Sequence, residues 1–88
     1  MRITFKLHAT LTDYLPRDAD GRKPRYNQLQ LDVPEGSDVQ SVIDGFKLPT
    51  RQVHLVLVNG FYVAPSTRST RRLSEGDALA IWPPIAGG

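Results

Sequence analysis

Residues 75–88 have the sequence EGDALAIWPPIAGG, which combines a turn, a strand and an unusual end. The first three of these residues favour a tight turn. The alternation that follows predicts a strand over residues 78–82, with Leu79 and Ile81 facing a core. Two prolines come next and cannot donate ladder hydrogen bonds. The sequence therefore predicts that the chain leaves its sheet after Trp82.

Strand signals upstream predict the rest of this sheet. Apolar and polar residues alternate over residues 1–7 and 28–33, as expected for half-buried strands. Residues 53–58 are nearly all apolar, which predicts a central strand covered on both faces. Asn59 and Gly60 favour a tight hairpin turn, so a short return strand should follow them.

One amphipathic helix is predicted between the second and third strands. Apolar residues recur at helical spacing over residues 39–46, and Ser37 with Gln40 predicts a capping box at the start. This order of elements indicates the α+β class, in the form of a roll whose mixed sheet of four to five strands packs over one helix. We expect a single domain over residues 1–82 and an extended, flexible tail over residues 83–88.

Composition excludes several classes of function. The 88 residues fit one small domain, and the absence of cysteine rules out disulfides, thiolate metal sites and cysteine nucleophiles. His8 and His54 are too few to build a metal centre and are expected as surface or edge residues. The sequence offers no serine–histidine–acid set and no glycine-rich phosphate loop, so we expect a protein that is not an enzyme. Without a signal peptide or a span of about 20 apolar residues, we expect a cytoplasmic protein with no membrane partner.

The end of the chain carries the chemistry that the sequence permits. Six residues should project as a tail: Pro83, Pro84, Ile85, Ala86, Gly87 and Gly88. Prolines keep such a segment extended, and glycines without a Cβ let its tip enter a narrow active site of a partner. A carboxylate is a poor acyl donor, so the Gly88 carboxylate would need a separate enzyme that adenylates it with ATP, and the chain itself should bind no cofactor and no metal. A persulfide nucleophile would then give a thiocarboxylate, and an amine would give an amide.

Four motifs together resemble those of a known family. They are VPEG at residues 33–36, VNG at 58–60, EGD at 75–77 and WPPIAGG at 82–88. In this combination the chain resembles the ubiquitin-like sulfur carriers, namely the molybdopterin synthase small subunit and the thiamine-pathway carriers. The resemblance implies a β-grasp fold and a Gly88 carboxylate that a ubiquitin-activating-type enzyme adenylates. It also implies loading as a thiocarboxylate from a persulfide donor protein and delivery to an acceptor synthase subunit in cofactor biosynthesis.

Three aromatic residues are further candidates for partner binding. Trp82 either packs the base of the tail against a partner or caps the edge of its own sheet. Phe61 and Tyr62 either form an exposed docking patch beside Ile85 or pack into the core.

Two rival functions stay open beside sulfur transfer. One is a protein modifier joined through Gly88 to lysine side chains. The other is a non-catalytic interaction or RNA-binding module. It would use two basic groups: Arg22, Lys23 and Arg25, and Arg68, Arg71 and Arg72. These residues lack interleaved aromatics, which argues against a nucleic-acid partner and favours solvated loops.

Overall fold

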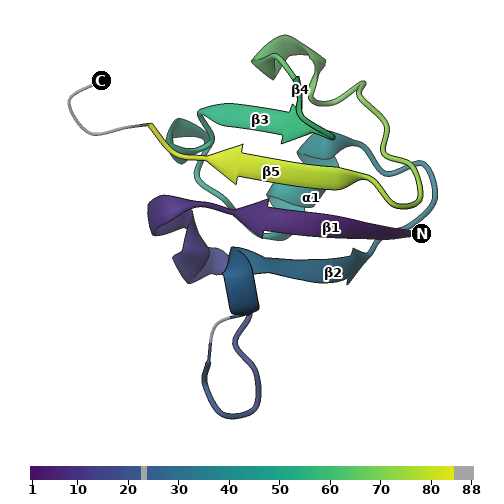
Figure 1. Cartoon of the computed structure of the whole chain (residues 1–88). Helices are drawn as coiled ribbons and strands as arrows, with labels where there is room; N and C mark the ends of the chain where they lie inside the picture. Colours follow the sequence, from purple (N-terminus) through teal and green to yellow (C-terminus); the bar gives the residue numbers. More distant parts are fainter. Residues whose placement is uncertain (23, 85–88) are drawn as a thin grey trace.

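The computed structural model describes residues 1–22 and 24–84, which form one mixed sheet and one α-helix (Figure 1). The strands are β1 (Arg2–Leu7), β2 (Gln28–Asp32), β3 (Leu55–Val58), β4 (Phe61–Tyr62) and β5 (Ala78–Trp82). The helix is α1 (Val39–Gly45), and short 3₁₀ turns are η1 (Ala9–Tyr14), η2 (Arg25–Asn27), η3 (Thr50–Gln52) and η4 (Pro65–Thr67). The predicted order of strands and helix is confirmed.

The strand order determines where the chain end leaves the sheet. The order is β2-β1-β5-β3-β4, so β5 lies between β1 and β3. Strands β1 and β5 are parallel, whereas the other neighbouring pairs are antiparallel. Parallel strands finish at the same edge of a sheet, and an antiparallel neighbour begins there. The end of β1, the end of β5 and the start of β3 therefore meet at one edge.

The core lies between the sheet and α1, which crosses one face of it (Figure 1). Strands β1 and β5 contribute fully buried side chains at alternate positions, as predicted: Ile3, Phe5, Leu7, Leu79 and Ile81. The helix contributes Val39, Val42 and Ile43 from its apolar stripe. Each buried aliphatic or aromatic side chain of this size contributes about 1.5–3 kcal/mol of transfer free energy.

Strand β3 is covered on one face only, so the prediction of a strand buried on both faces is wrong. Val56 and Val58 are buried, whereas Leu55 and Leu57 are half-buried on the face that α1 does not cover. A short apolar run does not say how many layers cover a strand, and here one helix supplies one layer. The open face of the sheet therefore carries apolar side chains.

The cap of α1 also differs from the prediction. Asp38 is the N-cap residue, and its Oδ1 accepts a hydrogen bond from the Ser41 amide at 2.8 Å. The Ser37 hydroxyl donates to a backbone carbonyl in the preceding turn, and the Gln40 side chain donates to Asp44. The predicted Ser37–Gln40 capping box is wrong because Asp38, an equally good N-cap residue, starts the helix one position later.

Buried Asp77 joins the two turns that the sequence predicted. One carboxylate oxygen accepts from the Ser74 amide at 2.8 Å, and the other accepts from Asn59 Nδ2 at 2.9 Å. Asn59 Oδ1 in turn accepts from the Ala78 amide at 2.8 Å. Asn59 and Gly60 have φ values of 53° and 85°, as a tight hairpin turn requires. The VNG and EGD motifs thus form one cluster at the start of β5.

Candidate functional site

The candidate site is the place where the chain leaves the sheet. Strand β5 ends at Trp82, and Pro83 and Pro84 follow it outside any strand. Pro84 is exposed. The other predicted tail residues lie outside the described residues, so their roles stay predictions: Ile85, Ala86, Gly87 and Gly88.

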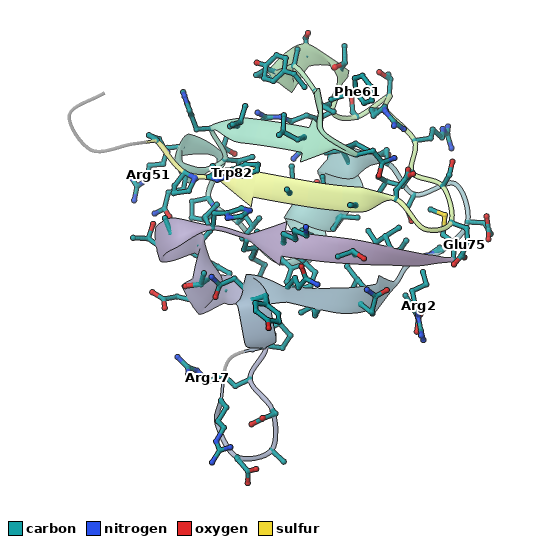
Figure 2. The ribbon with its side chains drawn as sticks, in the orientation of Figure 1. Arg2, Arg17, Arg51, Phe61, Glu75 and Trp82 are labelled. Atoms are coloured by element: carbon teal, nitrogen blue, oxygen red, sulfur yellow. The ribbon has the colours of Figure 1, made fainter. Side chains whose placement is uncertain are left out.

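The neighbouring chain segments hold Trp82 from both sides. The His54 amide donates to the Trp82 carbonyl at 3.0 Å, and the His8 amide donates to the Ile81 carbonyl at 3.1 Å. The His8 ring stacks on the Trp82 ring, with centroids 4.0 Å apart and planes 2° from parallel. We call His8, His54 and Trp82 the tail root. Figure 2 labels Trp82 and Arg51 at this edge of the sheet, and Arg2 and Glu75 at the opposite edge.

The tail root shows that Trp82 caps the edge of its own sheet. This is one of the two roles that the sequence left open, and contact with a partner stays a prediction. His8 is half-buried, as an edge residue should be, but its stacking on Trp82 was not foreseen. The stack follows from the parallel register of β1 and β5, which sets Leu7 opposite Ile81 and so brings the next residues together. No local sequence signal encodes that register.

The environment of His8 disfavours its charged form. Burial lowers the pKa of the His8 imidazole, and the positive charge of Lys6 lowers it further. The ring is therefore neutral near pH 7. Its Nε2 atom is buried and has no hydrogen-bond partner among the described residues.

Apolar side chains continue from Trp82 across the open face of the sheet. The register sets Leu55 opposite Trp82, and Leu57 opposite both Ala80 and Tyr62, so these five residues share a face. We call them the open-face strip. Tyr62 is 61% exposed. Contiguous exposed apolar surface on a small protein favours contact with another protein. Residues 53–58 were predicted as a strand buried on both faces, so Leu55 and Leu57 were not predicted as site residues.

Phe61 and Tyr62 are both exposed, so neither packs into the core. Phe61 is 78% exposed and lies opposite Val58, whose side chain faces the helix side of the sheet. Adjacent strand residues point to opposite faces. The two aromatics therefore do not share one face, and only Tyr62 belongs to the open-face strip. Ile85, which was predicted beside them, lies outside the described residues.

The second predicted basic group, Arg68, Arg71 and Arg72, does not form a free cationic surface. Arg68 is 5% exposed, and its Nη2 lies 3.5 Å from the backbone carbonyl just before β3. Burial lowers the pKa of its guanidinium. Arg72 donates to a backbone carbonyl in the turn before α1 at 3.0 Å. In the first group Arg22 is exposed, whereas Lys23 and the side chain of Arg25 lie outside the described residues. Two of the three cations of the second group thus serve the fold.

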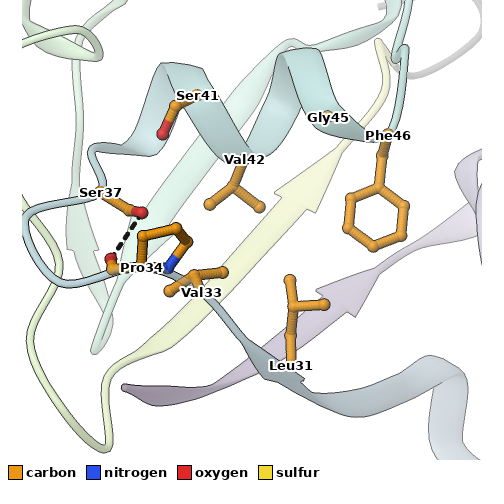
Figure 3. Close-up of a pocket in the computed structure, with 8 residues that line it drawn as sticks. All are labelled: Leu31, Val33, Pro34, Ser37, Ser41, Val42, Gly45 and Phe46. Atoms are coloured by element: carbon orange, nitrogen blue, oxygen red, sulfur yellow. Dashed lines mark hydrogen bonds between the residues drawn. The ribbon is translucent and has the colours of Figure 1, made fainter.

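An apolar groove lies between β2 and α1 (Figure 3). It has a volume of about 360 Å³ and is lined by Leu31, Val33, Pro34, Ser37, Ser41, Val42, Gly45 and Phe46. None of these lining residues is titratable, and none was predicted as a site residue. The groove therefore offers no titratable acid or base, and the hydroxyls of its two serines donate to backbone carbonyls.

The part of the chain that the structure describes contains neither a membrane-spanning helix nor a cluster of metal ligands. Over residues 1–22 and 24–84, no helix is both long and apolar enough to cross a bilayer. Within the same part of the chain, no three histidine, aspartate or glutamate side chains are grouped so that they could hold a metal ion.

Comparison with protein families identifies the chain. Residues 16–88 match the family model described as the ThiS family. The chain belongs to the ThiS family. The match includes four of the five strands, the helix and the whole C-terminal end, and it confirms the resemblance to ubiquitin-like sulfur carriers. A ThiS-family protein is a small carrier or subunit and not a catalytic enzyme, as expected. The comparison with curated proteins found no match.

Solved structures similar to this ThiS-family chain establish its fold. SAMP1 from Haloferax volcanii is 24% identical, with a TM-score of 0.68 and 100% of both chains covered. A putative molybdopterin converting factor subunit 1 from Pyrococcus furiosus is 19% identical, with a TM-score of 0.65 and coverage of 97% and 99%. The complex of subunits 1 and 2 of the molybdopterin-converting factor from Helicobacter pylori matches at 13% identity and a TM-score of 0.57, with both chains fully covered. The predicted β-grasp fold is confirmed.

Proposed function

We propose that this chain carries sulfur on its C-terminal carboxylate. A ubiquitin-activating-type enzyme binds the carrier and uses ATP to adenylate Gly88. A persulfide donor protein then supplies the sulfur, and the loaded thiocarboxylate delivers it to an acceptor synthase subunit in the biosynthesis of a cofactor such as molybdopterin or thiamine. The tail residues Ile85, Ala86 and Gly87 enter the partner's active site with it.

The steps balance without any catalytic group on the carrier. The Gly88 carboxylate attacks the α-phosphorus of ATP and releases pyrophosphate. The terminal sulfur of the persulfide attacks the acyl carbon and displaces AMP, which gives an acyl disulfide. A second thiol of the donor protein cleaves that disulfide, is oxidised with the first to a disulfide, and releases the thiocarboxylate. The carrier contributes only a narrow end and a surface for recognition.

The observation that carries the proposal is the join between β5 and the two prolines. A central strand with one buried face ends at Trp82, and Pro83 follows without an intervening loop. Proline fixes φ near −65°, so the segment beside the domain loses little freedom when a partner grips it. Family membership over residues 16–88 supports the same reading of this end.

The open-face strip supports recognition by the activating enzyme and the acceptor subunit. It begins at Trp82 and extends through Leu55, Leu57, Ala80 and Tyr62, so a partner that covers it also meets the start of the tail. The Helicobacter pylori structure is a complex of two subunits of the molybdopterin-converting factor. That likeness favours a synthase subunit as the acceptor for this chain.

Reconstitution tests the proposal. The carrier is incubated with ATP, its cognate activating enzyme and a persulfide donor, and its intact mass is measured. We expect a gain of one sulfur-for-oxygen mass difference located on Gly88. A carrier lengthened by one alanine after Gly88 is the matched control and should gain nothing. If the unmodified carrier also gains nothing while the enzyme hydrolyses ATP, sulfur carriage is refuted.

A second function, protein modification, is favoured by the likeness to SAMP1 and to another matching structure, which is described as small archaeal modifier protein 1 of Haloferax volcanii. The last trypsin site in the chain is Arg72, so trypsin would leave residues 73–88 on a modified lysine. An Ala86→Arg variant shortens this remnant to Gly-Gly, which standard peptide analysis detects. Finding that remnant on lysines of other proteins would support conjugation. Finding none from cells in which A86R is still adenylated would dismiss it.

A further inference from the structure

The only two histidines of the chain lie on either side of Trp82. His8 follows β1 and His54 precedes β3, and β5 runs between these strands. The backbone amides of both residues donate to the last two carbonyls of β5. These bonds fix the backbone of the strand up to Trp82, but they do not fix the Trp82 side chain or the chain beyond it.

The His8 ring contacts the Trp82 side chain directly. It lies flat on the Trp82 ring at 4.0 Å and 2°, on the open face of the sheet. His8 Nε2 makes no hydrogen bond with any described residue. The contact between His8 and Trp82 is therefore one of ring against ring.

Pro83 and Pro84 continue the chain in the direction that it has at Trp82. Pro83 and Pro84 each have a restricted φ, and the residue before a proline is restricted too, so this segment moves as a stiff unit. The six residues after Trp82 reach at most about 20 Å. A swing of about 20° at Trp82 would displace the tip of an extended chain of that length by about 7 Å, which is more than the width of a narrow active site tolerates.

We propose that His8 is a positioning residue for the C-terminal carboxylate: by stacking on Trp82, it sets the direction in which the tail leaves the sheet. The inference rests on the proposed function, because the direction matters only if the carboxylate is delivered to a partner. His8 touches no reacting atom, and it acts through Trp82.

Three variants test the role of the ring. His8→Ala removes it, and His8→Phe keeps a flat ring without a titrating nitrogen. Tyr26→Ala is the matched control, because it removes an exposed aromatic side chain next to β2, which β1 separates from β5. Each variant is titrated against the cognate activating enzyme, and adenylation is followed by ATP–pyrophosphate exchange.

A smaller fraction of correctly directed tails raises the apparent KM without changing kcat. We expect His8→Ala to raise the KM for the carrier roughly three- to tenfold at unchanged kcat. His8→Phe should restore the KM, and Tyr26→Ala should match the unmodified protein. Equal KM values for His8→Ala and the unmodified carrier would overturn the inference, as would a failure of His8→Phe to rescue.

A spectroscopic readout separates positioning from loss of fold. Nitrogen-15 relaxation is measured at the backbone amide and at the indole N–H of Trp82. His8→Ala should lower the order of these two groups while the β1 and β3 amides keep theirs, and His8→Phe should restore it. Unchanged order at both Trp82 groups in His8→Ala also overturns the inference. If the unmodified carrier is not adenylated at all but the relaxation changes appear, the proposed function fails and the role of His8 at the tail root stands.

Discussion

Replacement of Asp77 by alanine should destabilise the protein strongly, although Asp77 takes no part in the chemistry. Asp77 is 9% exposed, and both of its carboxylate oxygens accept hydrogen bonds, from the Ser74 amide and from Asn59. Hydrogen bonds to charged groups contribute about 1.5–3 kcal/mol each, and the part-exposed site lowers that value. We expect Asp77→Ala to reduce the free energy of unfolding by about 2–3 kcal/mol. For a domain of this size the midpoint should fall by about 10–20 °C.

Thermal unfolding followed by circular dichroism measures this change. The matched control is Asp32→Ala, because Asp32 pairs with Arg2 on the surface and both side chains are largely exposed. Exposed ion pairs contribute little, so the control should unfold close to the unmodified protein. If Asp77→Ala unfolds within a few degrees of the control, the cluster that joins the VNG and EGD turns does not stabilise the fold as argued.

Three further outcomes are expected. The fold lowers the pKa of His8, so below about pH 6.5 the unfolded chain binds more protons than the folded protein does. The free energy of unfolding should therefore fall as the pH drops through this range. His8→Phe should flatten that part of the curve of stability against pH. Leu79→Ala empties a fully buried site and should lower the free energy of unfolding by about 2–5 kcal/mol in urea titrations. Gly36→Ala should cost about 1–2 kcal/mol in the same assay, because Gly36 has φ of 82° and an added Cβ would lie 3.3 Å from Arg72 Nη1.

Local sequence patterns predicted the elements of the fold well, for a physical reason. Residues 1–7 and 78–82 alternate because each strand has one face on the core, and the period of two is visible in the sequence. The apolar run at residues 53–58 was misjudged, because coverage of a strand depends on what packs over it. The helix start was misplaced by one position, since Ser37 and Asp38 are both good N-cap residues and only the backbone geometry distinguishes them.

The candidate site was predicted less completely. The sequence identified Trp82 and the prolines as the exit of the tail, because proline chemistry acts locally. It did not identify the stack of His8 on Trp82, which depends on pairing between strands some 70 residues apart in the chain. It also did not separate Arg68 from the exposed basic residues, because burial of a guanidinium depends on tertiary packing.

The motifs that carry the family resemblance have two different roles: some stabilise the fold, and one leads into the C-terminal tail. Asn59 and Asp77 belong to the cluster at the start of β5, and Gly36 accepts the bond from Arg72 beside α1. These residues stabilise the fold at the edge away from the tail. Residues 82–88 alone continue into the part that a partner enzyme would handle. A carrier with Asp77→Ala, assayed at a temperature where it is still folded, should therefore be adenylated with the same KM and kcat as the unmodified protein. A change at the tail root should instead alter the KM while the protein stays as stable as the unmodified carrier.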